Sequence, residues 1–181
     1  MTTPTLSPLA LHRAPAAGFD EPFAMLDACH ERVERMLGLL ERLAAHLAQH
    51  GADAQAASAA RDVMRYFDQA APKHHEDEEL HVLPALRATG RPELAALAAR
   101  LHDDHERMSA AWSALRLTLS EVEQGRWPRG GTFDAVAPFA AAYRTHIAAE
   151  NEQAYPRACE RIVGAVREAM GREMAARRGV R

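Results

Sequence analysis

The feature that most constrains the fold of this chain is a short pattern that occurs twice. Residues 74–84 and 146–156 both read His, three residues, Glu, five residues and Pro, and the two copies start 72 residues apart. The first copy is crowded with charge, but the residues between His and Glu in the second copy are apolar, so a solvated charged face does not account for the repeat. On an α-helix, a His and a Glu four positions apart lie on one face. The pattern therefore predicts two helices that each present a His–Glu pair.

Apolar residues at three- and four-residue spacing predict four amphipathic helices around these pairs. The apolar stripes run from Leu26 to Leu47, from Ala60 to Ala85, from Leu94 to Val122 and from Val136 to Gln153. Gly and Pro mark the loops at Gly51, at 90–92 and at 125–131. We expect Asp20 to cap the first helix, Pro72 to kink or interrupt the second, and Thr132 to cap the fourth.

A further helix is expected over residues 157–178. Its apolar side comprises Ile162, Val163, Val166, Met170 and Met174. The basic residues near the end of the chain are interpreted as a solvated tail rather than a binding patch, and they are Arg172, Arg177, Arg178 and Arg181.

Four long helices with short loops predict an all-α fold, an antiparallel up-down four-helix bundle with an additional C-terminal helix. The expected organisation is an extended or mobile lead-in over 1–19, the bundle over 20–160, and a C-terminal helix and basic tail over 161–181. A chain of 181 residues, 48% of them hydrophobic, is long enough for one domain with a substantial core.

Charge and cysteine content narrow the functional classes. The net charge is −3 and the sequence has no strongly basic segment, which argues against a nucleic-acid partner. No apolar stretch reaches membrane length, and no signal peptide is recognisable. The two cysteines, Cys29 and Cys159, are far apart in the sequence and form no CxxC motif. A reduced, cytoplasmic setting is therefore expected.

Two further histidines lie on apolar stripes. His30 falls in the first stripe and His105 in the third, so each half of the chain is predicted to be a helical hairpin with one His on its first helix and His-x3-Glu on its second. Counting residues from the loops at 1.5 Å per residue places all these groups at similar heights. The six residues expected to converge are His30, His74, Glu78, His105, His146 and Glu150.

Four imidazoles and two carboxylates buried at one level need partners, because an unpaired buried charge costs on the order of several kcal/mol. A hydrogen-bonded structural network is one explanation, and metal ions that coordinate every group are the favoured one. One tetrahedral zinc would leave two ligands over. Two ions bridged by the carboxylates use all six, and this nitrogen and oxygen donor set suits iron, with manganese and zinc as alternatives.

With these residues in place, the chain resembles the hemerythrin-like family, specifically the bacterial HHE cation-binding domains. The match covers roughly residues 20–160 and includes Pro84 and Pro156 after each Glu. The resemblance implies a four-helix bundle with two non-haem iron ions, bridged by oxo or hydroxo groups and by Glu78 and Glu150. It further implies that His74 and His105 serve one iron and that His30 and His146 serve the other. Oxygen-carrying hemerythrins differ, because they have His-x3-His on the third helix and end their ligand set with Asp.

Other histidines and one tyrosine leave alternatives open. His75 and Glu79 also fit His-x3-Glu, but His74 and Glu78 continue the apolar stripe and match the second copy in their distance to proline. Three residues are candidates for outer partners or an extra ligand, namely His81, His102 and Tyr143. The remaining histidines are interpreted as surface residues, namely His12, His46, His50 and His75.

The expected function is a di-iron protein that binds or senses a small diatomic ligand such as oxygen, nitric oxide or peroxide. An iron reservoir or an iron and redox sensor is the alternative, followed by a di-iron oxidase or peroxidase and by an iron-centre repair protein. A metal- or gas-binding protein is favoured over an enzyme, because the sequence shows no flavin or electron-partner motif. A ferritin-like site is disfavoured, because that class uses Glu-x2-His and more carboxylates.

Overall fold

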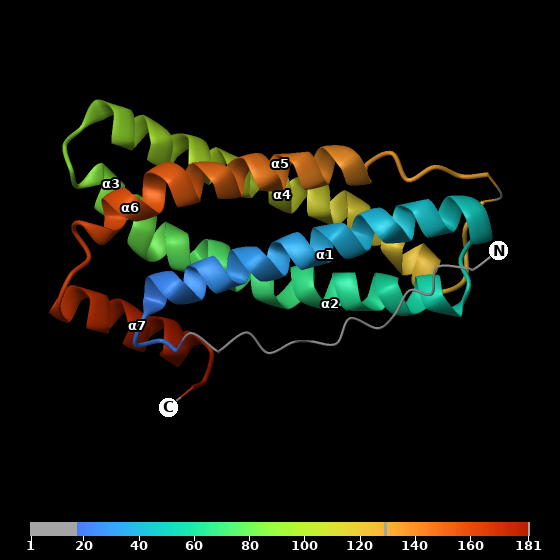
Figure 1. The fold of residues 1–181 in the computed structure, drawn as a ribbon, viewed down its shortest axis with the longest axis horizontal. Coiled ribbons are helices and arrows are strands. Elements are labelled where there is room, and N and C mark those ends of the chain that lie inside the picture. Colours follow the sequence, from blue (N-terminus) through green and yellow to red (C-terminus); the bar gives the residue numbers. More distant parts are fainter. Residues whose placement is uncertain (1–17, 129, 181) are drawn as a thin grey trace.

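The computed structural model describes residues 18–128 and 130–180, and in this part of the chain every regular element is a helix (Figure 1). The elements are α1 (Pro22–His50), α2 (Ala54–Asp77), η1 (Glu78–Val82), α3 (Leu83–Arg87), α4 (Pro92–Glu123), α5 (Val136–Ala149), η2 (Glu150–Ala154), α6 (Tyr155–Cys159) and α7 (Ala165–Arg177). The all-helical fold agrees with the sequence prediction. The expected lead-in lies, up to residue 17, outside the described residues, as do His12 and Arg181.

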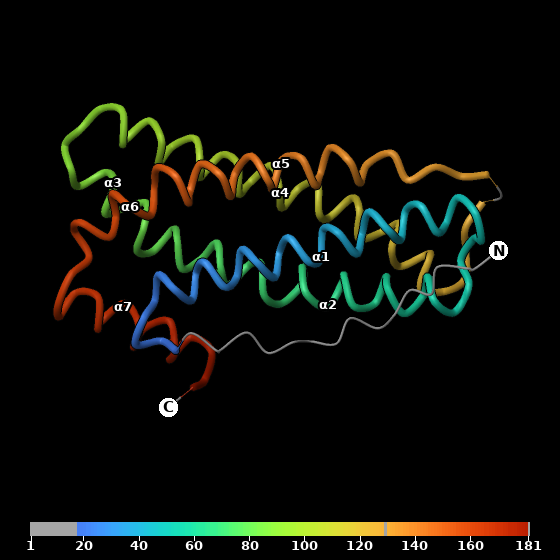
Figure 2. The backbone as a smooth tube through the Cα atoms, viewed as in Figure 1, coloured from blue at the N-terminus to red at the C-terminus, as the bar shows by residue number. Residues whose placement is uncertain are grey.

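The long helices α1, α2, α4 and α5 lie lengthwise along the molecule (Figures 1 and 2). The trace in Figure 2 crosses the molecule along α1 and returns along α2. Helix α2 packs against α1 and α4, and α5 packs against α1 and α4. In the part of the chain that the structure describes, no helix is both long and apolar enough to span a membrane.

The loop after α1 follows the predicted turn chemistry. Gly51 ends α1 with φ of 73°, a value that glycine adopts at little cost. Asp53 caps α2, and its carboxylate accepts a hydrogen bond from the Ala56 backbone N–H at 2.9 Å. Short closures of this kind place consecutive helices side by side.

Two predicted caps are wrong. Helix α1 begins at Pro22 with Glu21, not Asp20, at the capping position, and Glu21 makes no side-chain cap. Helix α5 begins at Val136, and the hydroxyl of Thr132 instead donates to Asp134 at 2.9 Å within the preceding loop. In α1 the helix begins at Pro22, so the capping position falls on Glu21 and not on Asp20. In α5 the loop continues to Ala135, so Thr132 lies too far before the first helical turn to cap it.

The predicted interruption at Pro72 is also wrong, because α2 continues through it to Asp77. The regular α-helix gives way further along, to a π-helical turn at Glu78–Val82, and a second π-turn occurs at Glu150–Ala154. Each π-turn ends two residues before a proline, Pro84 or Pro156. Proline has no N–H to donate to the preceding turn, and at Pro84 and Pro156 that turn is widened, whereas the regular α-helix accommodates Pro72.

The buried apolar side chains form two separate clusters. One cluster lies between the long helices at the end of the molecule where the α1–α2 loop is, and it includes Leu40, Phe67, Trp112 and Phe139. The other lies at the end that carries α3, α6 and α7 and includes Leu26, Leu86, Leu101 and Met174. The positions between the two clusters along each long helix are occupied by the buried ionisable residues described below.

The C-terminal helix α7 is docked on the bundle, so the expectation of a solvated basic tail is wrong for Arg177 and Arg178, whereas Arg172 is exposed as expected. The guanidinium of Arg178 binds the buried carboxylate of Asp77 at 2.6 Å, and Arg177 binds the same carboxylate. Glu173 accepts from His81 at 2.7 Å. At Gly171 an added Cβ would lie 1.9 Å from the carbonyl oxygen of Phe19, so glycine permits this close approach.

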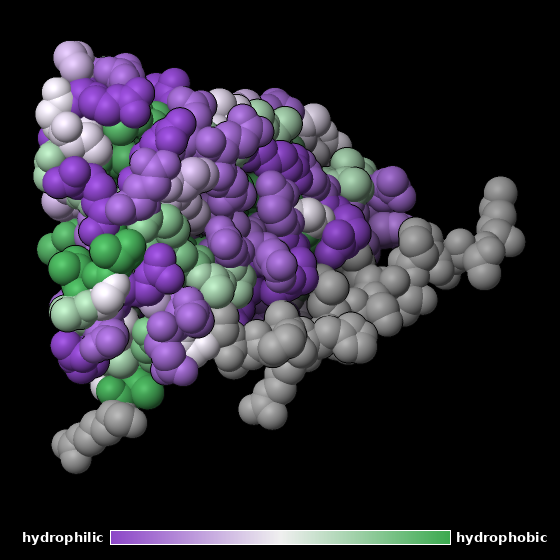
Figure 3. Space-filling view, turned by 60° about the vertical axis from the view of Figure 1, so that its left-hand side comes forward, coloured by the Kyte–Doolittle hydropathy of each residue, from purple (hydrophilic) through white to green (hydrophobic). Residues whose placement is uncertain are grey.

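The apolar side of the C-terminal segment is only partly as predicted. Met170 and Met174 are buried, and Ile162 is buried before α7 begins, whereas Val163 and Val166 are 55% and 59% exposed. The chain turns at Gly164, with φ of 52°, so the residues on either side do not share one helix face. Figure 3 shows this end of the molecule, where patches of hydrophobic surface lie among mainly hydrophilic residues.

Candidate metal centre

The structure brings all six predicted residues together in the layer between the two apolar clusters. His30 comes from α1, His105 from α4 and His146 from α5, while His74 lies in the last turn of α2. Glu78 and Glu150 are the first residues of the two π-turns. Each of the six is at most 6% exposed. Four helical segments thus supply two carboxylates and four imidazoles to one buried site.

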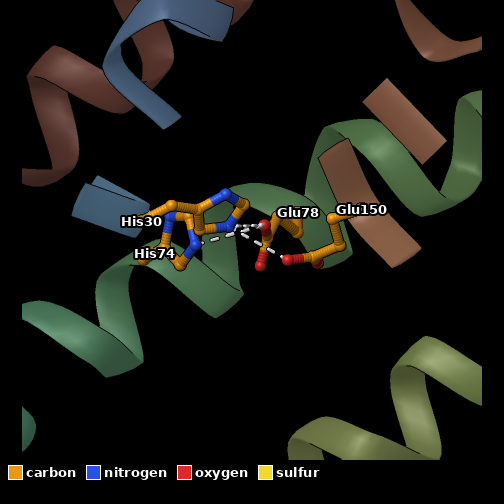
Figure 4. A group of neighbouring side chains, drawn as sticks. All are labelled: His30, His74, Glu78 and Glu150. Carbon is orange, nitrogen blue, oxygen red and sulfur yellow. Dashed lines mark ion pairs between the residues drawn. The ribbon is translucent and has the colours of Figure 1, made fainter. Parts of the chain in front are cut away.

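The six residues form two groups that share both carboxylates. In the first group, one donor atom each from His30, His74, Glu78 and Glu150 lies within 4.8 Å of the others (Figure 4). The second group combines the same carboxylates with His105 and His146. This grouping differs from the pairing implied by the family resemblance, which joined His74 with His105. The relative height and rotation of neighbouring helices decide the partners, and the sequence pattern does not carry that information.

In the first group, each carboxylate contacts one of the two imidazoles. His30 Nε2 lies 3.0 Å from Glu150 Oε2, and His74 Nε2 lies 3.3 Å from Glu78 Oε1. Figure 4 shows the two imidazoles facing the two carboxylates across a short gap. The donor atoms therefore surround a common point.

The second group uses the other oxygen of each carboxylate. His146 Nε2 lies 3.0 Å from Glu150 Oε1, and His105 Nε2 lies 3.4 Å from Glu78 Oε2. The two Nε2 atoms are 3.1 Å apart. Each glutamate thus presents one oxygen to each group, which is the arrangement expected of a carboxylate that bridges two cations.

Hydrogen bonds among these residues do not satisfy the buried polar atoms. Glu78 Oε2 and both oxygens of Glu150 are buried and have no hydrogen-bond partner among the described residues, although imidazole nitrogens lie close by. The imidazole–carboxylate contacts are as short as hydrogen bonds, but their geometry leaves these carboxylate oxygens without a hydrogen-bond partner in the described part of the chain. Buried polar atoms are normally paired. Cations between the side chains would satisfy these atoms, so the residues present fit a metal centre.

Comparison with known proteins agrees with this geometry. The family model described as "Hemerythrin HHE cation binding domain" matches residues 21–158. The chain belongs to this family. It is also 32% identical over 166 residues to a protein of Haemophilus influenzae (strain ATCC 51907 / DSM 11121 / KW20 / Rd) described as "Uncharacterized protein", a match that covers 91% of this chain and 94% of the relative. The family resemblance predicted from the sequence is confirmed.

Charge in the hemerythrin-like site is distributed unevenly. Burial lowers the pKa of His105, but the carboxylates of Glu150 and Glu78 outweigh burial and raise the pKa to about 10. Burial likewise opposes the charge on Glu150, yet three neighbouring imidazoles hold its pKa well below the usual range. His74 is fully enclosed, and burial lowers its pKa. Without bound cations, protons on His105 therefore balance part of the carboxylate charge.

The residue after each glutamate orients a histidine of the opposite half. His105 Nδ1 donates to Glu79 Oε1 at 2.7 Å, and His30 Nδ1 donates to Asn151 Oδ1 at 2.9 Å. A hydrogen bond at Nδ1 fixes the ring and directs Nε2 toward the centre. Glu79 is half-buried and Asn151 is exposed, so each reaches its histidine from the edge of the site rather than from the interior.

Tyr155 also lies at the site, although no sequence pattern predicted it. Its hydroxyl lies 3.1 Å from His30 Nε2 and donates a short hydrogen bond to Glu78 Oε1, and its ring stacks on that of His30. Burial and the neighbouring carboxylates raise the pKa of Tyr155 well above its usual value. Tyr155 stands directly before the proline of the second copy, where the first copy has Leu83. This difference between otherwise similar copies was the available signal.

The predicted outer residues have other contacts. His81 binds Glu173 of α7, and His102 lies 3.0 Å from Glu79, so neither belongs to the two donor groups. Tyr143 is buried among aromatic rings, with its ring centroid 5.0 Å from that of Phe139.

His75 is not a free surface residue, which corrects the prediction. It is half-buried, and its ring stacks on His105 with 4.3 Å between centroids. Burial, followed by repulsion from His105, lowers its pKa well below the usual value. His46 is also mostly covered and contacts Asp53 at 3.0 Å, whereas His50 is exposed.

Proposed function

We propose that this chain is an antiparallel up-down four-helix bundle that holds two iron ions bridged by Glu78 and Glu150. The supporting observation is that each carboxylate directs one oxygen to each group of imidazoles. His30 and His74 would hold one ion, and His105 and His146 the other. Mixed imidazole and carboxylate donors with more than four coordination positions favour iron over zinc.

We further propose that the centre binds or senses a small diatomic ligand, oxygen or nitric oxide. Bound iron would supply open coordination positions and reversible one-electron chemistry. The protein contributes the surroundings, because apolar clusters on both sides of the buried layer disfavour charged or bulky ligands. His105 and His30 are held by Glu79 and Asn151, so the nitrogen donors are oriented before a ligand arrives.

The test is metal content together with an optical spectrum. We expect two irons per chain in protein loaded anaerobically, and near-ultraviolet oxo-bridge bands that appear on exposure to oxygen. Reversal of the bands on removal of oxygen supports ligand binding, whereas irreversible oxidation contradicts it. The double variant His74→Ala/His146→Ala should lose stoichiometric iron while His102→Ala keeps it. Two irons retained in the double variant would contradict the assigned site.

A second function, an iron or redox sensor, is favoured by the docking of α7. Asp77, directly before the π-turn that begins with Glu78, and His81, within that turn, both contact the C-terminal segment of α7. A change in this turn on metal loss would reach α7 directly. Hydrogen exchange of residues 165–177, measured with and without iron, tests this function. Faster exchange without iron is expected for a sensor, and equal exchange would contradict it.

A further inference from the structure

The two donor groups are not equivalent, because a phenol oxygen lies against only one of them. Tyr155 Oη is 3.1 Å from His30 Nε2 and contacts Glu78 Oε1, and both of these atoms belong to the first group. In the described part of the chain, the Nε2 atoms of His105 and His146 contact each other and the two carboxylates. The first group therefore has five neighbouring donor atoms and the second has four.

The spacing of Tyr155 Oη matches that of a metal ligand. Ligand atoms bound at about 2.1 Å and at right angles to one another are roughly 3 Å apart. The contact of Tyr155 Oη with His30 Nε2 has this length, as does the contact of His30 Nε2 with Glu150 Oε2. Tyr155 is also enclosed, at 5% exposure, and is held by ring stacking on His30 at 5.3 Å. The phenol oxygen is thus placed by the same packing that places the other donors.

A hydrogen bond to Glu78 alone does not explain both contacts of the phenol. Nδ1 of His30 donates to Asn151, so Nε2 of the neutral ring carries a lone pair. The hydroxyl has one proton and two acceptors next to it, His30 Nε2 and Glu78 Oε1. In the neutral ring the contact of the phenol with His30 Nε2 is between two lone pairs, which a cation would attract together. Against the effect of burial, Glu150 raises the pKa of His30, and in the protonated ring Nε2–H donates to the phenol oxygen, so a bound cation would take the place of that proton.

We propose that Tyr155 is a fifth protein ligand, as phenolate, to the metal held by His30 and His74. The inference rests on the proposed metal centre and adds a ligand to it. The O–H bond is replaced by an oxygen–metal bond, and the proton is released to solvent as the metal binds. With Tyr155 bound, the first metal has five protein donors. The second metal, held by His105 and His146, keeps more open positions and is the one that takes a small external ligand.

The experiment compares ferric-loaded wild type with Tyr155→Phe and with the control Tyr143→Phe. Tyr143 is a buried tyrosine of the neighbouring apolar cluster whose ring packs on Phe139 and Phe67. We expect a visible phenolate-to-iron charge-transfer band in wild type and in Tyr143→Phe, with tyrosine ring modes enhanced by resonance Raman excitation into that band. Tyr155→Phe should keep two irons per chain and lose both signals.

Two outcomes would overturn the inference. Two irons per chain without a phenolate band in wild type would remove Tyr155 from the ligand set and leave the metal centre intact. Failure of wild type to hold iron would remove the centre and the ligand together, so the two failures are distinguishable. Azide titration gives an independent readout. We expect one azide to bind per wild-type chain and two per Tyr155→Phe chain. Equal numbers would contradict the inference that the two metals differ in their number of open coordination positions.

Discussion

The carboxylate of Glu79 accepts a hydrogen bond from His105 Nδ1 at 2.7 Å. Glu79 follows the bridging candidate Glu78, and both residues lie in the first π-turn. Glu79 also contacts His102 Nδ1 at 3.0 Å, so one partly exposed carboxylate connects two histidines of α4. The first π-turn thereby supplies Glu78 as a candidate metal ligand and Glu79 as the group that orients His105.

Replacing Glu79 with Ala should weaken metal binding by about tenfold, because the ring of His105 loses the partner that orients it. Glu106→Ala is the matched control, since Glu106 is 72% exposed and its one ion pair in the described part of the chain is with His102 at 3.7 Å. Competition titration with a chelator measures both variants. Equal affinity in Glu79→Ala and Glu106→Ala would show that His105 is held by other contacts.

Replacing His75 with Ala should leave two metals per chain, whereas His74→Ala should lose at least one. His74 Nε2 faces Glu78, whereas His75 packs its ring on those of His105 and Tyr143 and belongs to neither donor group. The His75 variant should also melt at a lower temperature, because a half-buried ring is lost from the site. Metal analysis and thermal melting test this pair. Loss of metal in His75→Ala alone would move the His-x3-Glu register by one residue.

Replacing Arg178 with Ala should lower the free energy of unfolding by about 2 kcal/mol, since the buried carboxylate of Asp77 loses a charged hydrogen-bond partner. Arg172→Ala is the control. Arg172 is 70% exposed and, among the residues that the structure describes, pairs only with Glu168, so its loss should cost less than about 0.5 kcal/mol. Urea unfolding of metal-free protein measures both. Similar losses in the two variants would mean that α7 is not anchored through Asp77.

Metal-free protein should lose stability as the pH rises from about 6.5, the ordinary pKa of histidine, to about 10. The pKa of His105 is raised in the folded state, so folding binds its proton more tightly than the unfolded chain does. This contribution is fully present below the unfolded pKa and disappears as the pH passes the folded pKa. Unfolding midpoints between pH 6 and 10 measure the effect. His105→Gln should show a flatter profile, and an unchanged profile would contradict the assignment.

The sequence by itself determined the all-helical class and the six inward residues of the site. Helical spacing fixes the face on which a side chain lies, and the repeat of His-x3-Glu shows that both halves follow one plan. Counting residues from the loops placed the six at similar heights, because the rise per residue of a helix is constant. These inferences need only local geometry.

The tertiary structure decided which of those residues face one another. The pairing of His30 with His74 depends on the offset and rotation between α1 and α2, which no single helix encodes. The approach of Tyr155 to His30 and the binding of Asp77 by α7 join residues about 100 or more positions apart in the sequence. Such contacts arise from packing between segments, so periodicity along one segment predicts the faces that are buried, and only the packed fold selects the partners.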